Sequence, residues 1–247
     1  MARDLSARQP VVVECLGLPG VGKSHVTRLL AARLATTGVP AGSALLSINH
    51  DYGRWRRIVR KSGMGAVEVT RAPRRALRVA RMLMRSGQQS RVDVVRLAYN
   101  WFVYAALVRR ARSQPRVELL DEGLFQLLWS AGFAGRDRAI HDCAAALVET
   151  NGATPDVVVF VEAPVNAILN RLERRSSGGA RIDRMTIGVR HAALDRGAGL
   201  LAEVLSEKRA LFGSAATPIV RTIRNEGAEA LDADIDALAR ELASLAS

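Results

Sequence analysis

Short apolar runs alternate with segments of helical periodicity along most of the chain. The first run, Val11–Leu16, is β-branched and almost entirely apolar, as is typical of strands buried on both faces of a parallel sheet. Similar runs follow at Ser43–Ile48, Val117–Leu120, Val157–Val161 and Pro218–Ile223. The alternation predicts an α/β protein whose parallel sheet carries helices on both faces.

Apolar residues at helical spacing predict the helices between these strands. Val26, Leu29, Leu30 and Leu34 share one face of a segment that ends at Gly38, and glycine is a common helix terminator. Four helices are predicted in this way: Lys23–Thr37, Pro164–Arg174, Leu200–Phe212 and Glu229–Leu245. The stretch 51–115 contains no convincing strand, so we predict two or three helices there.

The chain has 247 residues, enough for one domain with a buried core. Its longest apolar run, from Trp101 to Val108, is far shorter than the ~20 residues that a membrane-spanning helix needs. Two cysteines are too few for a disulfide framework or a zinc site. We therefore expect a single-domain, cytoplasmic protein with no transmembrane segment.

The net charge of +12 comes from one part of the chain. Residues 54–116 contain 17 basic residues against two acidic ones, Glu68 and Asp93, while the rest of the chain has a net charge of −3. Four arginines share one face of the predicted helix Pro73–Arg85. Compositional bias and a solvated basic face explain this pattern, and so does binding to an anionic ligand, a nucleic acid or an acidic membrane surface.

The strongest motif is G-x-x-x-x-G-K-[ST], which follows the first predicted strand and opens the first predicted helix. It comprises Gly17, Leu18, Pro19, Gly20, Val21, Gly22, Lys23 and Ser24. Glycines let the backbone wrap closely around a phosphate, and the amides at the helix start point toward the anion. Lys23 is expected to reach the β- and γ-phosphates, and Ser24 to bind Mg²⁺. His25 either packs in the first helical turn or lies beside the nucleotide.

Two further segments fit a phosphoryl-transfer site. The third predicted strand ends in Asp121, our candidate carboxylate for Mg²⁺, although an acid here could also cap a helix. Glu122 either supports Asp121, orients an acceptor or faces solvent. Arginines flank the Gly- and Ser-rich stretch within 174–184, as in a mobile lid, with Arg174 and Arg181 as catalytic candidates. An exposed basic loop is the alternative.

With these features, the chain resembles the P-loop kinase superfamily of nucleoside and nucleotide kinases, and its layout is most similar to thymidylate-kinase-like proteins. The resemblance implies a five-stranded parallel sheet, ATP and Mg²⁺ as cofactors, and a helical acceptor-binding insert at 51–115. In thymidylate kinases the third strand ends in Asp-Arg-Tyr, and the Arg helps to bind the acceptor phosphate. Here Asp121 matches the Asp of that motif, but Glu122 stands in the position of the Arg. The adenine-contacting loop of the family would correspond to Asn225 and its neighbours.

These observations favour ATP-dependent phosphoryl transfer to a small anionic or hydroxyl-bearing acceptor, as either a monomer or a homodimer. The expected acceptor-binding arginines are Arg54, Arg57, Arg71 and Arg74. For a hydroxyl acceptor, Asp51 is the first candidate for the adjacent carboxylate and Glu122 the second. The alternative is a nucleotide-dependent regulatory protein whose basic insert contacts a partner, a nucleic acid or a membrane. We expect no specific nucleic-acid binding, because aromatic residues are not interleaved with the arginines.

Overall fold

The computed structural model describes residues 9–50, 53–136, 139–150, 153–174, 182, 185–212 and 218–247. Its centre is a parallel sheet of five strands in the order β2–β3–β1–β4–β5, which confirms the predicted fold class. The strands are β1 (Val11–Leu16), β2 (Ala41–Gly42), β3 (Val117–Leu120), β4 (Val157–Glu162) and β5 (Ile219–Arg224).

Strand β1 lies in the middle of the sheet and is buried along its whole length. It pairs with β3 on one side, with Val11 opposite Val117, and with β4 on the other, with Val13 opposite Val157. This position explains the nearly continuous apolar sequence of β1, because both faces of a central parallel strand are covered by helices.

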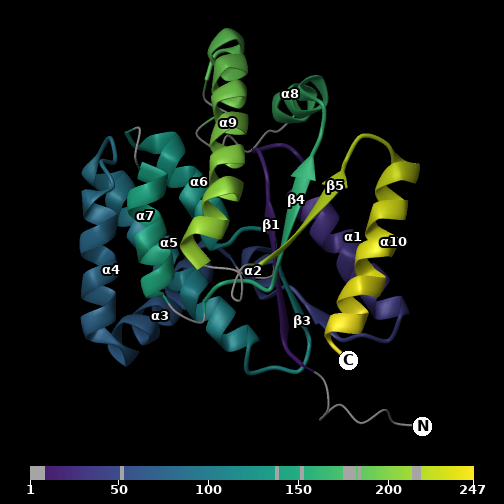
Figure 1. Ribbon diagram of the computed structural model, residues 1–247, viewed down its shortest axis with the longest axis horizontal. Helices are drawn as coiled ribbons and strands as arrows, with labels where there is room; N and C mark the ends of the chain where they lie inside the picture. The colour runs from purple at the N-terminus through teal and green to yellow at the C-terminus, as the bar shows by residue number, and fades with distance from the viewer. Residues whose placement is uncertain are drawn as a thin grey trace.

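Helices cover both faces of the sheet (Figure 1). On one side lie α1 (Lys23–Thr36) and α10 (Ala228–Leu245), and on the other lie α5 (Arg91–Ala111), α6 (Leu124–Ala134) and α7 (Ala139–Glu149). Beyond the carboxyl ends of the strands are α8 (Val165–Glu173) and α9 (Ile187–Phe212). Within the described part of the chain, no helix has the length and apolar character required to cross a membrane.

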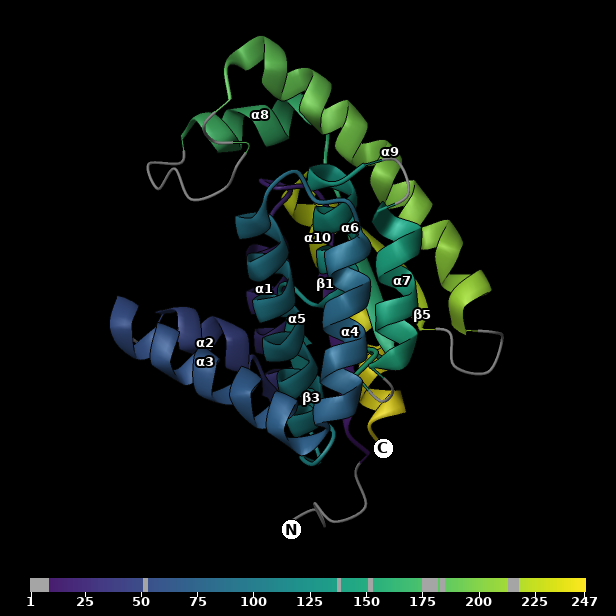
Figure 2. The ribbon, with the colours of Figure 1, turned by 90° about the vertical axis from the view of Figure 1, so that its left-hand side faces the viewer.

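The predicted helical stretch after the second strand contains α2 (Ala44–His50), α3 (Arg54–Arg71), α4 (Pro73–Arg85) and α5. Figure 2 shows these four helices together on one side of the molecule. Helix α5 packs against α3, α4 and α6, and so joins the stretch to the rest of the fold.

The prediction of a strand at Ser43–Ile48 was wrong. The second strand is the two-residue β2, which pairs with the start of β3, and the chain turns into α2 directly afterwards. The Glu118 carboxylate accepts a hydrogen bond from the Ala44 N–H at the start of α2 (2.6 Å). Leu45 and Ile48 are buried three residues apart, a spacing that places both on one helical face.

Candidate functional site

The carboxyl ends of β1, β3, β4 and β5 meet at one edge of the sheet, because the strands are parallel. Strand β1 has β3 on one side and β4 on the other, so the chain connections leave it in opposite directions. Ligands in open parallel α/β folds bind at such a point. A cavity of about 500 Å³ lies here, above the loop that follows β1.

The loop Gly17–Ser24 turns from β1 into α1 and forms the floor of the cavity. Gly20 (φ +84°) and Gly22 (φ +103°) have left-handed backbone conformations, which favour glycine because a Cβ would be strained there. A Cβ on Gly22 would also collide with the Asn225 side-chain amide. The two motif glycines are therefore required by the fold of the loop itself.

Two side chains hold this loop in place. The Asn225 amide donates a hydrogen bond to the Val21 carbonyl (2.7 Å), and the Arg171 guanidinium donates to the same oxygen (2.9 Å). Arg171 also donates to the Asn225 carbonyl (3.2 Å). Asn225 thus lies beside the phosphate-binding loop, where its observed contacts are with protein backbone, and its contact with adenine stays a prediction.

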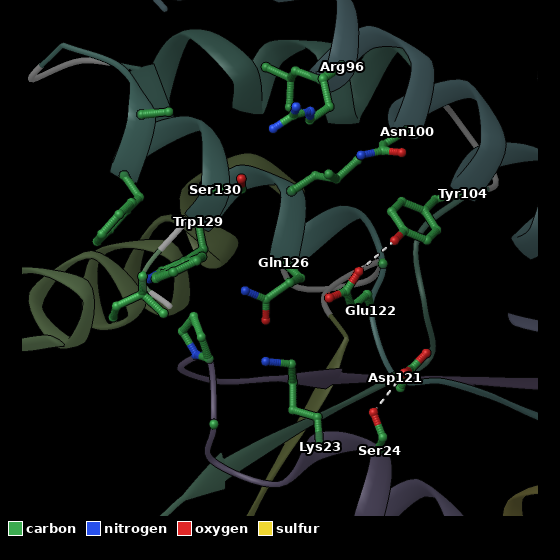
Figure 3. Close-up of a pocket in the computed structure, with 18 of the residues that line it drawn as sticks. Lys23, Ser24, Arg96, Asn100, Tyr104, Asp121, Glu122, Gln126, Trp129 and Ser130 are labelled. Atoms are coloured by element: carbon green, nitrogen blue, oxygen red, sulfur yellow. Dashed lines mark hydrogen bonds between the residues drawn. The ribbon is translucent and has the colours of Figure 1, made fainter. Parts of the chain in front are cut away.

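Lys23 and Ser24 make their observed contacts with protein atoms, so their roles in phosphate and metal binding stay predictions. The Lys23 ammonium donates hydrogen bonds to the carbonyls of Gly17 (2.8 Å) and Leu18 (3.2 Å). Its side chain rises from the loop toward the cavity (Figure 3). The Ser24 hydroxyl donates to Asp121 Oδ2 (2.9 Å). The structure therefore brings the end of β3 and the start of α1 into direct contact.

Asp121 has an electrostatic environment suited to a cation. Burial raises the pKa of its carboxyl, and the nearby Glu122 charge raises it further, while the Ser24 hydroxyl bond and Lys23 act in the opposite direction. Its Oδ1 atom is buried and has no hydrogen-bond partner among the described side chains. Because an unsatisfied buried carboxylate oxygen is costly, a bound cation would stabilise this arrangement.

These residues fit Mg²⁺ bound together with a nucleotide. Mg²⁺ prefers oxygen ligands and is commonly bound by one or two carboxylates together with substrate phosphates and water. Asp121 and the Ser24 hydroxyl supply the protein oxygens at this position. In the described ranges no group of three or more His, Cys, Asp or Glu side chains could hold a metal, so phosphate and water oxygens would complete the coordination.

Glu122 points away from Asp121, toward the opposite side of the cavity (Figure 3). The buried Tyr104 hydroxyl on α5 donates a hydrogen bond to Glu122 Oε2 (2.9 Å). Burial and the adjacent Glu122 carboxylate raise the pKa of Tyr104 well above its usual value, so this hydroxyl remains a donor. Asp121 thus faces the phosphate-binding loop, while Glu122 faces the part of the cavity beside α5.

Helices α5 and α6 form the walls opposite the loop. Arg96 and Asn100 extend from α5, and Gln126 and Ser130 from α6, with Trp129 beside them (Figure 3). Trp129 stacks on Phe133, with ring centroids 5.1 Å apart. The wall combines hydrogen-bonding groups with an aromatic pair, as is typical of small-molecule sites.

Of the four predicted acceptor-binding arginines, the three whose side chains are described do not line this cavity. Arg71 and Arg74 are exposed at the junction of α3 and α4, and Arg57 is likewise not among its described lining residues. The course of the helices explains the positions of Arg71 and Arg74. Helix α5 runs from the cavity down to Arg112, which bonds Asp156 just before β4, and the α3–α4 junction lies at that lower end of the molecule (Figure 2). The described cavity cations are Lys23, Arg28, Arg96 and Arg171.

Several predicted residues fall at or beyond the limits of the described structure. Asp51, Arg181 and the side chain of Arg54 lie outside the described residues. Arg174 is described and is exposed at the end of α8, one turn beyond Arg171. Ile182, within the predicted lid 174–184, is buried and lines the cavity, as does His25 near the loop. The catalytic role of the lid stays a prediction.

The residues that sequence reasoning missed have a recognisable pattern. Asp93, Arg96, Asn100 and Tyr104 follow one another at spacings of three and four in a helix whose other residues from Val92 to Val108 are mostly apolar. Such spacing places them on one helical face, and here that face borders the cavity. In α6, Gln126 and Ser130 are four residues apart and are the only polar side chains of the helix. Polar residues at helical spacing in these two helices were therefore the sequence pattern that could have predicted the walls of the cavity.

Comparison with known proteins gives similarity in structure but not in sequence. No protein-family model and no curated protein matches the sequence. Among solved structures, a deoxyadenosine kinase from M. mycoides with bound dCTP matches with 8% identity, over 95% of this chain and 100% of that one. The TM-score is 0.49. At this TM-score and identity the match carries no argument about function, so the substrate of this chain has to be argued from its own cavity.

Proposed function

We propose that this protein is an ATP-dependent kinase that phosphorylates a hydroxyl group of a small molecule bound between α5 and α6. The loop Gly17–Ser24, with Lys23 above it and Ser24 bonded to Asp121 (2.9 Å), supports binding of a nucleoside triphosphate. The cavity of about 500 Å³ that adjoins the loop leaves room for a second substrate.

The position of Glu122 is the observation that carries this proposal. Its carboxylate lies at the cavity, held by Tyr104 at 2.9 Å, on the side away from Ser24. A carboxylate at this position can accept a proton from a hydroxyl, whereas it would repel an acceptor phosphate. A hydroxyl acceptor therefore fits the site better than a phosphate, and Glu122 takes precedence over Asp51 as the base.

The reaction then proceeds with few protein groups. The acceptor hydroxyl gives its proton to Glu122 as its oxygen bonds to the γ-phosphorus, and the bond from that phosphorus to the bridging oxygen breaks to leave ADP. Lys23 stabilises charge on the transferring group, where most catalysis of phosphoryl transfer lies. When bound, Mg²⁺ would neutralise charge on the β- and γ-phosphates beside Ser24 and Asp121.

The walls of the cavity indicate what kind of molecule carries the hydroxyl. Arg96, Asn100, Gln126 and Ser130 offer both donors and acceptors of hydrogen bonds. The stacked Trp129 and Phe133 provide an apolar surface beside them. A small polar compound that combines hydroxyl groups with a flat or apolar part matches this lining.

An acceptor screen with ATP and Mg²⁺ tests the proposal. The panel should contain nucleosides, sugars and other hydroxyl compounds, each beside its phosphorylated form, with ADP and product measured together. Lys23→Ala is the blank, and Glu122→Gln should reduce transfer by roughly 10²–10⁴-fold. Stoichiometric ADP and phosphorylated product support the kinase. Hydrolysis of ATP that no acceptor stimulates would contradict it and favour a nucleotide-dependent regulatory protein.

A further inference from the structure

Helix α3 exposes an apolar strip on the side turned away from the core. Trp55 is 78% exposed, Val59 68% and Ile58 42%. These residues are three and four apart, so they form one continuous strip on the helix. Val67 and Val69, further along α3, are also exposed. An exposed Trp among aliphatic side chains is unusual on a soluble surface and marks a contact site.

Exposed arginines border this strip. Arg56 and Arg60, one turn apart, lie beside Trp55 and Val59 and are exposed. Helices α3 and α4 together carry eleven basic residues and one acidic residue, Glu68. Glu68 is buried and accepts two hydrogen bonds from Arg109 (2.9 and 2.5 Å). The strip is therefore apolar and cationic, with no acidic side chain of α3 or α4 exposed beside it.

Helix α4, which packs against α3 (Figure 2), also exposes apolar side chains. Leu77 is 50% exposed and Met84 58% exposed, with the exposed Arg74 and Arg81 nearby. We define the docking face as Trp55, Arg56, Ile58, Val59 and Arg60 of α3. No described residue of α3 or α4 lines the cavity, so the docking face is distinct from the proposed kinase site.

We propose that this docking face binds the surface of an anionic lipid bilayer. A helix with Trp and aliphatic residues on one strip and Arg beside them can lie in the plane of a membrane interface, with its apolar side chains among the acyl chains. The arginines then contact anionic headgroups, which attract basic segments at close range. The protein would rest on the membrane and not cross it.

The charge pattern argues against two other candidate partners, a second copy of the protein and a nucleic acid. A second copy in a two-fold dimer would present the same cationic face, so the arginines of the two copies would face one another and repel. A nucleic acid would neutralise the arginines, but its backbone gives Val59 and Ile58 no apolar surface to bury. An anionic bilayer offers acyl chains to the apolar residues of the docking face and negative headgroups to its arginines.

Tryptophan fluorescence provides a direct test with the full chain. The protein has three tryptophans, of which Trp101 and Trp129 are buried and Trp55 is exposed. The protein is titrated with vesicles of phosphatidylcholine alone and of phosphatidylcholine with phosphatidylglycerol, and binding is measured in parallel by co-sedimentation. We expect binding and a blue shift only with the anionic vesicles. Trp55→Phe should retain much of the binding but lose the blue shift.

Two variants separate the charge from the apolar strip. Arg56→Ala/Arg60→Ala and Ile58→Ser/Val59→Ser should each weaken vesicle binding by roughly tenfold or more. The control, Arg224→Ala/Arg240→Ala, removes the same charge from exposed positions on β5, the edge strand opposite β2, and on α10, and should bind like the wild type. Circular dichroism checks that each variant is folded.

Three results would overturn the proposal. The first is equal binding to neutral and anionic vesicles, and the second is wild-type binding by both α3 variants. The third is a blue shift of Trp55 that follows protein concentration without vesicles, together with a larger species in sedimentation velocity, because a second copy would then cover the docking face.

Discussion

The Gln126 side chain accepts a hydrogen bond from the Gly17 N–H (3.2 Å), and so joins a wall of the cavity to the first residue of the phosphate-binding loop. The backbone N–H of Gln126 donates to Glu14 on β1 (2.8 Å). One residue of α6 is thus fixed to both the strand and the loop that follows it. A shift of α6 would therefore also move the phosphate-binding loop.

Gln126→Ala should therefore weaken ATP binding as well as acceptor binding. The substitution leaves the Gly17 N–H without this acceptor, and a lost partner at a buried backbone group costs about 1–3 kcal/mol. We expect the Kd for ATP to rise roughly tenfold or more, measured by calorimetry. Ser130→Ala, one turn further along α6, should change only the acceptor KM. Equal effects of the two variants on ATP would contradict the coupling.

Asp121→Asn should reduce turnover through the metal. The amide keeps the shape of the side chain and removes the charge that faces Ser24, so we expect kcat to fall roughly ten- to a thousandfold, with a higher Mg²⁺ requirement. Because the pKa of Asp121 is raised, the wild type should also need more Mg²⁺ as the pH falls, beginning at a higher pH than for an ordinary carboxyl. An unchanged Mg²⁺ dependence in the variant would place the metal carboxylate elsewhere.

The sequence predicted the fold and the floor of the site because local patterns encode both. The strand Val11–Leu16 and the helix Pro73–Arg85 have the predicted bounds, since each pattern is set by its own side chains. The contact between Ser24 and Asp121 was also predictable. Both follow strands of one parallel sheet, and such strands end at the same edge.

The walls of the cavity could not be predicted in the same way. Which face of α5 borders the cavity depends on how α5 packs against α3 and α6, and no local pattern states this packing. Closeness in sequence to the predicted second strand favoured Arg71 and Arg74 instead, although both lie at the junction of α3 and α4. The course of a helix across the fold, not its composition, decided which arginines reach the site.

Glu14 should make the stability of the fold depend on pH. Burial raises the pKa of this carboxyl to about 7 in the folded protein, although α6 backbone N–H groups act against the rise. The folded state then holds a proton that the unfolded state releases near its ordinary pKa of 4.5. Stability from this group is full below pH 4.5 and is lost as the pH rises to about 7.

Glu14→Gln should remove this pH dependence. The difference between variant and wild type in the free energy of unfolding should change by up to about 3 kcal/mol across that window. Urea unfolding of both proteins at several pH values measures it, and the comparison cancels the titration of other carboxyls. A constant difference from pH 4.5 to 7 would show that Glu14 titrates normally in the folded state.

Arg171 lies on α8, and Arg174 lies one turn further along, just beyond the end of the helix. The two arginines are therefore a matched pair for substitution. Arg171 bonds the Val21 and Asn225 carbonyls (2.9 and 3.2 Å), whereas Arg174 is exposed. Arg171→Ala should lower the Tm and raise the Kd for ATP, because the loop loses a brace. Arg174→Ala should leave both unchanged and lower kcat, as expected for a lid cation that acts in the transition state. If Arg174→Ala weakens ATP binding instead, the segment is a nucleotide clamp.

Tyr104 should act on the reaction only through Glu122. Tyr104→Phe removes the hydroxyl that holds Glu122 Oε2 at 2.9 Å and keeps the ring within the core. We expect kcat to fall roughly tenfold with little change in the Kd for ATP. In the Glu122→Gln background, the same substitution should cost much less, because the base is already absent. Single-turnover rates of the four proteins give this comparison, while thermal unfolding reports any loss of packing. Independent, additive effects on the rate would mean that Tyr104 supports the fold of α5 and does not position the base.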